Sequence, residues 1–182
     1  EAVNRLKLAN ALLLTSQGIA FLHAGQERGR TKPAFTTAGT SDCETIGSFV
    51  KNSYDSSDNI NNFVWNLSDL NKDLFEYTKN LIALRKNNSA FTISTQDEVM
   101  SRISLLGEYC EDFFMVYKIL DEKGDWYLFF NSDGEDKNID LNLDGKKILY
   151  ADKEKVYPFG SDCCLQDVVV KGGSVLILRN VK

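Results

Sequence analysis

The chain has 182 residues, enough for one domain or two small ones with a buried core. Hydrophobic residues make up 43% of the sequence and charged residues 26%, which is usual for a globular protein. The formal net charge of −5 provides no basic field that would attract nucleic acid. No apolar run approaches the roughly 20 residues that a membrane-spanning helix needs. We therefore expect neither a nucleic-acid partner nor a membrane partner.

The four cysteines, Cys43, Cys110, Cys163 and Cys164, contain no C-x-x-C pair, and His23 is the only histidine. A zinc site built from cysteine and histidine is therefore not expected, and neither is another metal or a cofactor. Free thiols are the simplest reading of the cysteines. A single Cys43–Cys110 disulfide is the alternative.

The first part of the chain follows the order helix, strand, loop. Apolar residues recur at helical spacing over residues 2–16, which predicts a helix. The apolar run over residues 19–23 then predicts a short buried strand, and residues 25–62 form a long polar loop. A loop that follows a parallel strand lies at the edge of the sheet where α/β barrels place their active sites.

A second helix is predicted over residues 68–86. Ser68 is a suitable N-cap, and Arg85 and Lys86 suit the negative end of the helix dipole. One face of this helix carries an apolar stripe: Leu70, Leu74, Tyr77, Leu81 and Leu84.

From about residue 91 the pattern changes to short apolar or alternating runs separated by turn residues. The runs cover residues 113–120, 126–130, 139–143, 147–150, 168–170 and 175–178. Turn signals such as Asp144-Gly145 and Gly172-Gly173 lie between them. This pattern predicts an antiparallel β-domain, built as a β-sandwich, with its boundary near residues 88–91.

Four motifs resemble a known family. They are LANALLLTSQGIAFLHAGQERGRTK at residues 8–32, NSYDSSDNINNFVW at 52–65, LFEYTKNLIALRKNNSAF at 74–91 and VKGGSVLILR at 170–179. The first resembles the last barrel helix and eighth strand of type I pullulanase-like debranching enzymes of the α-amylase glycoside hydrolase family. The second is similar to their asparagine-serine-tyrosine loop, the third to their eighth barrel helix, and the fourth to their final strand.

The resemblance implies an α/β fold joined to an all-β fold. Residues 1–90 would be the terminal part of a (β/α)8 TIM barrel, and residues 91–182 an antiparallel β-sandwich. The implied activity is hydrolysis of α-1,6-glucosidic linkages in pullulan, glycogen or branched starch by a retaining mechanism. In the family the catalytic acids lie on strands that precede Glu1, so no catalytic residue is expected here. The implied partners are an α-glucan and the remainder of the barrel, and the chain alone would be inactive.

The resemblance places sugar contacts in the long loop. The expected substrate-binding residues are Asn52, Tyr54, Asp58, Asn61 and Arg30. Amides, carboxylates, guanidinium groups and aromatic rings match the hydroxyls and apolar faces of sugars. For the two asparagines and the aspartate the alternative is turn formation, and for the tyrosine it is packing. For Arg30 the alternative is to orient acids within the barrel mouth. Glu27 is expected to be a structural acid at the barrel mouth, paired with Arg28 or Arg30.

Some residues depart from the family pattern. Gln26 stands where a second acid is usual, Arg28 where an apolar residue is usual, and Val64 where an aspartate precedes Trp65. Residues 33–51 resemble an enlarged insertion in the loop.

Two other functions are compatible with the sequence. The aromatic-rich β-domain could be a non-catalytic carbohydrate-binding or structural module of a glucan-active protein. Most aromatics of the run over residues 126–130 would then form core, with an exposed aromatic contacting glucan. Within the enzyme class, a branching or isoamylase-type activity is the nearest alternative.

Overall fold

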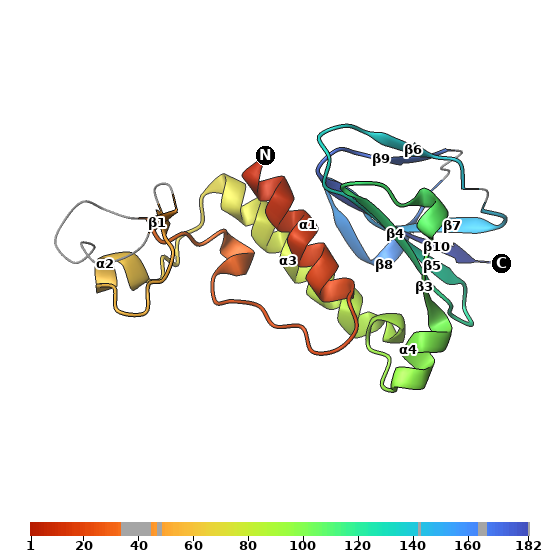
Figure 1. Ribbon diagram of the computed structural model, residues 1–182, viewed down its shortest axis with the longest axis horizontal. Helices are drawn as coiled ribbons and strands as arrows, with labels where there is room; N and C mark the ends of the chain where they lie inside the picture. The colour runs from red at the N-terminus through yellow and green to blue at the C-terminus, as the bar shows by residue number, and fades with distance from the viewer. Residues whose placement is uncertain (34–44, 47–48, 142, 164–166, 182) are drawn as a thin grey trace.

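The computed structural model describes residues 1–33, 45–46, 49–141, 143–163 and 167–181. Its centre is an antiparallel β-sheet that carries two long helices, α1 and α3, on one face (Figure 1). A small two-stranded sheet covers part of the other face. The described part of the segment between the two helices extends away from the sheet, at the left of Figure 1. The molecule therefore has a packed body and a loop region.

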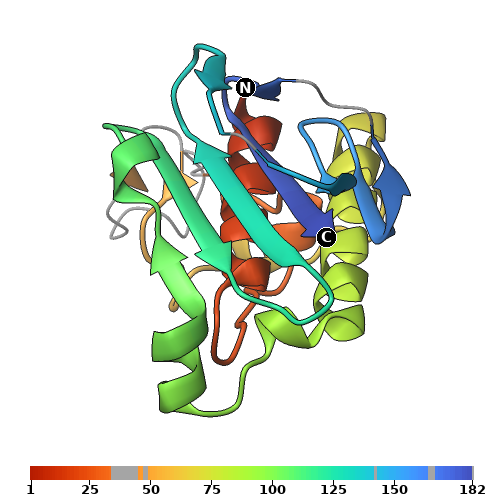
Figure 2. The same ribbon diagram turned by 90° about the vertical axis from the view of Figure 1, so that its right-hand side faces the viewer.

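Helices α1 (Ala2–Thr15) and α3 (Asp69–Asn87) confirm the two helices predicted from the sequence. Ser68 caps α3, because its side-chain oxygen accepts a hydrogen bond from the Asn71 N–H at 3.3 Å. The predicted stripe is buried at Leu74, Tyr77, Leu81 and Leu84, while the side chain of Leu70 lies outside the described part. The two helices lie side by side behind the sheet in Figure 2.

Polar contacts fix α1 against α3 at both ends of their interface. The Asn10 amide donates to Thr78 Oγ1 at 2.9 Å, and both residues are fully buried. Buried Lys7 pairs with Asp73 at 2.6 Å. At the other end the Arg85 guanidinium donates to three carbonyl oxygens at 2.6–2.9 Å. One belongs to Leu14 in the last turn of α1, and the others belong to Ser16 and Gly18 just after the helix. These bonds satisfy carbonyl groups that a helix end leaves without partners.

The main sheet has the strand order β3-β4-β5-β10-β7-β8 within the described ranges, and every neighbouring pair is antiparallel. Its strands are β3 (Ile103–Leu105), β4 (Phe114–Ile119), β5 (Asp125–Asn131), β7 (Lys146–Ala151), β8 (Val156–Asp162) and β10 (Ser174–Val181). The central strands β5 and β10 pair in register from Asn131 with Ser174 to Asp125 with Asn180. The antiparallel β-structure predicted after residue 91 is confirmed.

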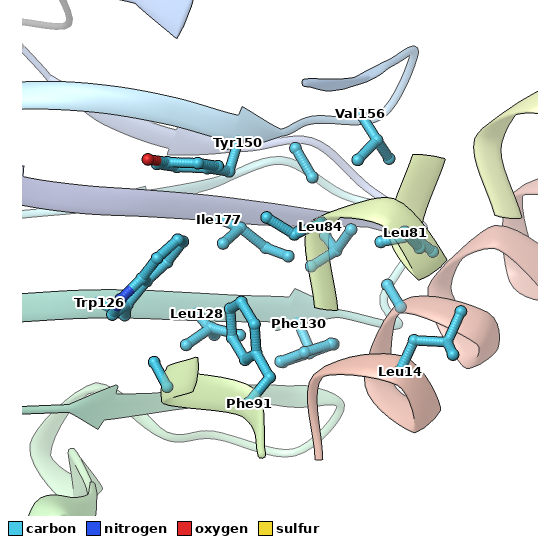
Figure 3. Packing of buried hydrophobic residues seen from close by; sticks show 14 of the residues in the cluster. Leu14, Leu81, Leu84, Phe91, Trp126, Leu128, Phe130, Tyr150, Val156 and Ile177 are labelled. Atoms are coloured by element: carbon cyan, nitrogen blue, oxygen red, sulfur yellow. The ribbon is translucent and has the colours of Figure 1, made fainter. Parts of the chain in front are cut away.

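Strand β5 is buried on both faces of the sheet. Trp126, Leu128 and Phe130 point to the helices and belong to the core that also contains Leu14 of α1 and Leu84 of α3 (Figure 3). The alternate residues of the strand point to the opposite face, as the period of a strand requires. The helices and the sheet therefore share one hydrophobic core across the predicted boundary near residues 88–91.

The opposite face of the sheet packs against β6 (Lys137–Ile139) and β9 (Val168–Val170), which pair with each other. Val168 and Val170 contact the cluster that contains Tyr127 and Phe129 of β5. In the described ranges this second layer has only these two strands. The β-sandwich of residues 91–182 and the barrel of residues 1–90 stay predictions.

The strand predicted over residues 19–23 is wrong. The segment is extended but unpaired, because no strand of the described chain lies beside it to accept and donate the hydrogen bonds that a strand needs. Its side chains still alternate. Ala20 and Leu22 pack against the core, whereas Ile19 and Phe21 are 97% and 80% exposed.

The remaining described elements are short. They are η1 (Gln26–Arg28), β1 (Thr45–Ile46), β2 (Phe49–Val50), α2 (Asp58–Asn61), η2 (Ser89–Phe91), α4 (Gln96–Arg102) and η3 (Gly107–Tyr109). Cys110 and Cys163 are free thiols. Cys43, Cys164 and most of the predicted insertion over residues 33–51 lie outside the described residues.

Candidate functional site

The loop region brings residues 24–33 together with residues 49–67. A sharp turn begins at Gly25, whose φ of +94° is open to glycine and strained for other residues. A Cβ at this position would lie 2.6 Å from the Cβ of Arg30, so no side chain fits there. The turn aims Arg30 at the second half of the loop.

Arg30 joins the two halves of the loop. Its guanidinium donates to the carbonyl oxygen of Ala24 at 3.3 Å, to that of Asn62 at 3.2 Å and to that of Asn61. It also lies 5.5 Å from the ring centre of Phe63, within the range of a cation–π contact. Arg30 therefore holds the loop by its terminal nitrogens, and its buried Nε has no hydrogen-bond partner within the described chain.

Asn61 is the second residue that holds the loop. Its amide donates to the carbonyl oxygens of Ser53 and Ser56, both at 2.8 Å. Lys32 donates to the hydroxyl of Ser53 as well. Arg30 and Asn61 thus direct these hydrogen bonds into the loop and stabilise its shape.

Asn52, Tyr54 and Asp58 lie on the outer side of this loop. Asn52 forms a turn, because its Oδ1 accepts from the Tyr54 N–H at 3.2 Å. Tyr54 is 95% exposed, and Asp58 is the exposed first residue of α2. In the described ranges neither the Tyr54 hydroxyl nor the Asp58 carboxylate has a hydrogen-bond partner. The Tyr54 hydroxyl and the Asp58 carboxylate are therefore open to a ligand.

Glu27 is paired with Arg28, at 3.2 Å between Oε1 and Nε, and its other oxygen accepts from the Gly25 N–H at 3.1 Å. Arg28 in turn donates to the carbonyl oxygen of Trp65 at 2.8 Å. Its guanidinium carbon lies 5.4–5.5 Å from the ring centres of Phe63, Trp65 and Phe75. The sequence did not reveal this cluster. The available signal was the cation at position 28 in a loop that has aromatic residues further along.

A hollow of about 370 Å³ opens beside this cluster. Its lining combines guanidinium groups, amides and one aromatic ring: Arg28, Arg30, Asn59, Asn62, Phe63, Asn66 and Asn71. Such groups provide donors and acceptors for hydroxyls together with an apolar surface. Of the predicted substrate-binding residues, Arg30 alone lines the hollow in the described structure. The others lie in the same loop but do not converge on it.

Within the described ranges, no three His, Cys, Asp or Glu side chains gather closely enough to hold a metal ion. None of the described helices is long and apolar enough to cross a bilayer.

The chain is similar in fold to pullulanases of known structure. Over 97–99% of its length the chain matches crystal structures of such enzymes. It is 25% identical to the pullulanase SAP of group B Streptococcus in complex with maltotetraose, with a TM-score of 0.80. It is also 25% identical to the type I pullulanase of Bacillus subtilis complexed with maltose, with a TM-score of 0.78. It covers 28% and 24% of those chains.

The sequence is also similar to Pullulanase A of Streptococcus pneumoniae serotype 4, with 32% identity over 197 aligned positions. The match covers 88% of this chain but 15% of the relative, so the chain spans only a small part of that enzyme's length. No family model matches the sequence. The resemblance to pullulanases is confirmed, and the chain is a pullulanase-like fragment.

Proposed function

We propose that this chain is part of a glycoside hydrolase that hydrolyses α-1,6-glucosidic linkages in pullulan, glycogen or branched starch. The observation that carries the proposal is the match to Pullulanase A along 88% of the chain. Related structures that hold maltotetraose or maltose support an α-glucan as the ligand. The lining of the loop hollow, with its amides, two guanidinium groups and one aromatic ring, suits such a ligand, because sugar hydroxyls both donate and accept hydrogen bonds.

In this proposal residues 1–90 complete a TIM barrel and residues 91–182 form its C-terminal β-sandwich domain. The two catalytic carboxyl groups belong to other parts of the enzyme, about 5 Å apart, as a retaining mechanism requires. One attacks the anomeric carbon, and the other protonates the departing glycosidic oxygen. This chain contributes sugar contacts on the donor side of the bond.

The loop contacts divide the predicted site residues into two roles. Tyr54 and Asp58 bind the glucan, because their polar atoms are exposed and free. Arg30 and Asn61 keep the loop in shape, and Glu27 positions Arg28. Asn52 sets the turn that presents Tyr54.

The test uses the complete enzyme that contains this chain, assayed on pullulan, amylose and glycogen. We expect cleavage of pullulan, and Asp58→Asn should lower kcat/KM by about tenfold or more, mainly through KM, because it removes a charged acceptor. Asp55→Asn is the matched control, since Asp55 is exposed in the same loop. Transfer of glucan branches on amylose without cleavage of pullulan would contradict the proposal and favour a branching enzyme.

A further inference from the structure

A second hollow lies between helix α1 and the start of strand β4 and shares no lining residue with the loop hollow. Its volume is about 880 Å³, and it is open to solvent. Leu8 of α1, Met115 of β4 and Phe130 of β5 form an apolar floor. Phe113 stands at its edge and is 72% exposed. All of these lining residues belong to this chain.

Phe113 holds an unusual backbone conformation. It is the third residue of a tight turn in which Glu111 and Phe114 exchange two backbone hydrogen bonds of 3.1 Å. Its φ is +66°, and it is the only non-glycine residue with positive φ in the described chain. Glycine is the favoured residue at such a turn position, because a side chain crowds the backbone there. The positive φ therefore costs conformational free energy. Because the Phe113 side chain stays largely exposed, its burial offsets little of that cost.

The surrounding structure locks this conformation in place. The backbone N–H and the hydroxyl of Ser132 both donate to the carbonyl oxygen of Phe113, at 2.8 and 2.9 Å. The following residue, Phe114, is buried in the sheet and anchors the other side of the turn. Strain that is held by several contacts and does not help packing is typical of a residue retained for binding.

Both cationic and anionic side chains stand at the rim of the hollow. Arg5 and Lys153 supply donors, and Glu1, Glu111 and Asp133 supply acceptors, with Arg5 and Glu1 paired at 2.6 Å. Because neither sign dominates, the hollow does not select an anion or a cation. An apolar floor, an exposed ring and a mixed polar rim fit a pyranose, which has an apolar C–H face and a ring of hydroxyls.

We propose that the hollow between α1 and β4 is a second α-glucan-binding site, in which Phe113 stacks against a glucosyl ring. The choice of glucan rests on the proposed function, but the site itself is separate from the loop that serves the reaction. It would hold a branch of a polymeric substrate while another part of the polymer is cleaved.

The test is affinity electrophoresis of the full chain in native gels that contain glycogen. Phe113→Gly removes the ring and relieves the positive φ, so it should weaken glycogen binding about three- to tenfold while the melting temperature stays the same or rises. Phe113→Leu keeps an apolar side chain without an aromatic face and should weaken binding in the same way. Phe159→Ala is the matched control, because Phe159 is 83% exposed on strand β8 away from the hollow, and it should bind as the unchanged chain does.

Three results would overturn the inference: a chain that glycogen does not retard, a Phe113→Gly variant that binds as well as the unchanged chain, or a Phe113→Leu variant that retains full binding. The last result would show that binding needs an apolar side chain but no aromatic face. None of these results would contradict the proposed hydrolysis, because that activity is measured on the complete enzyme and through the loop residue Asp58.

Discussion

The packed body and the loop region are held together by different kinds of contact. In the body, α1, α3 and the sheet bury large side chains, and Trp126, Phe91 and Leu84 are fully removed from solvent. In the loop, Arg30 and Asn61 bind backbone carbonyl groups while Tyr54 and other side chains stay exposed. The body is therefore stabilised by apolar burial, and the loop keeps a defined shape through a few polar side chains.

The proposed function would explain this difference. A surface that binds a sugar must keep hydroxyl-binding groups in contact with water until the ligand arrives. Apolar burial would remove those groups from reach, whereas hydrogen bonds to the backbone shape the loop and leave its outer face free. The following predictions test whether the two regions respond separately.

The largest effect is expected for Trp126→Ala. Trp126 is fully buried, and its ring centre lies 4.9 Å from that of Phe91 and 4.5 Å from that of Tyr150. The cavity should lower the free energy of unfolding by about 3–5 kcal/mol, measured by urea denaturation. The control is Trp65→Ala, which removes a side chain that is 75% exposed and should cost well under 1 kcal/mol. Equal losses in both variants would remove the distinction between the two regions.

Alkaline pH should weaken the body through two tyrosines. Burial raises the pKa of Tyr117 to about 12, with partial offset from its hydrogen bond to Thr15. Burial, followed by the nearby Asp152 carboxylate, raises the pKa of Tyr77 further. The folded state therefore retains protons that the unfolded state releases above about pH 10. Stability should be complete below pH 10 and fall by about 1.4 kcal/mol per pH unit for each tyrosine between pH 10 and 12.

Urea denaturation at pH 8, 10, 11 and 12 measures this slope. Tyr117→Phe should reduce the slope by about half above pH 10. Tyr54→Phe should leave it unchanged, because Tyr54 is 95% exposed. A stability that rises between pH 10 and 12 would contradict the assignment.

The smallest global effect is expected for Asn61→Ala. This variant loses the two hydrogen bonds to Ser53 and Ser56, so backbone amides of the loop should exchange with deuterium several-fold faster. The unfolding midpoint should change little, because the apolar core is untouched. Asn59→Ala is the control in the same helical turn, and Asn59 is exposed. A fall in the midpoint as large as that of Trp126→Ala would show that loop and body unfold as one unit.

The sequence predicted the elements whose pattern is set within the element itself. The helix α3 begins and ends within two residues of the prediction, because its cap, its stripe and its terminal cations agree. Strand β9 lies where the run over residues 168–170 predicts it. Local pattern and tertiary packing favour the same structure in both cases.

The elements that the sequence missed depend on neighbours in space. Strand β8 contains Pro158 and Gly160, which argue against a strand, but it lies at the edge of the sheet, where proline is tolerated. Residues 19–23 have an apolar pattern typical of a strand but no strand beside them in the described structure. The pattern of a segment thus predicts which side chains face inward, and pairing decides whether it becomes a strand.

The location of the candidate site stays a prediction, and the contacts that its residues make could not be predicted from the sequence alone. The family resemblance placed it in the loop, and the residue types matched sugar chemistry. Arg30 and Asn61 hold the loop, whereas Asp58 faces outward. These different roles follow from hydrogen bonds between segments that are separated in the sequence. The contacts of Arg28 with three aromatic rings have the same origin.

The core shared by α1 and β10 has a consequence for synthesis. Leu14 near the beginning of the chain packs in the same cluster as Val175 and Ile177 near its end. Ribosomes add on the order of 5–20 residues per second, so α1 waits on the order of ten seconds before its partner strand has been made. During that interval the apolar face that α1 turns to β10 lacks its partner strand.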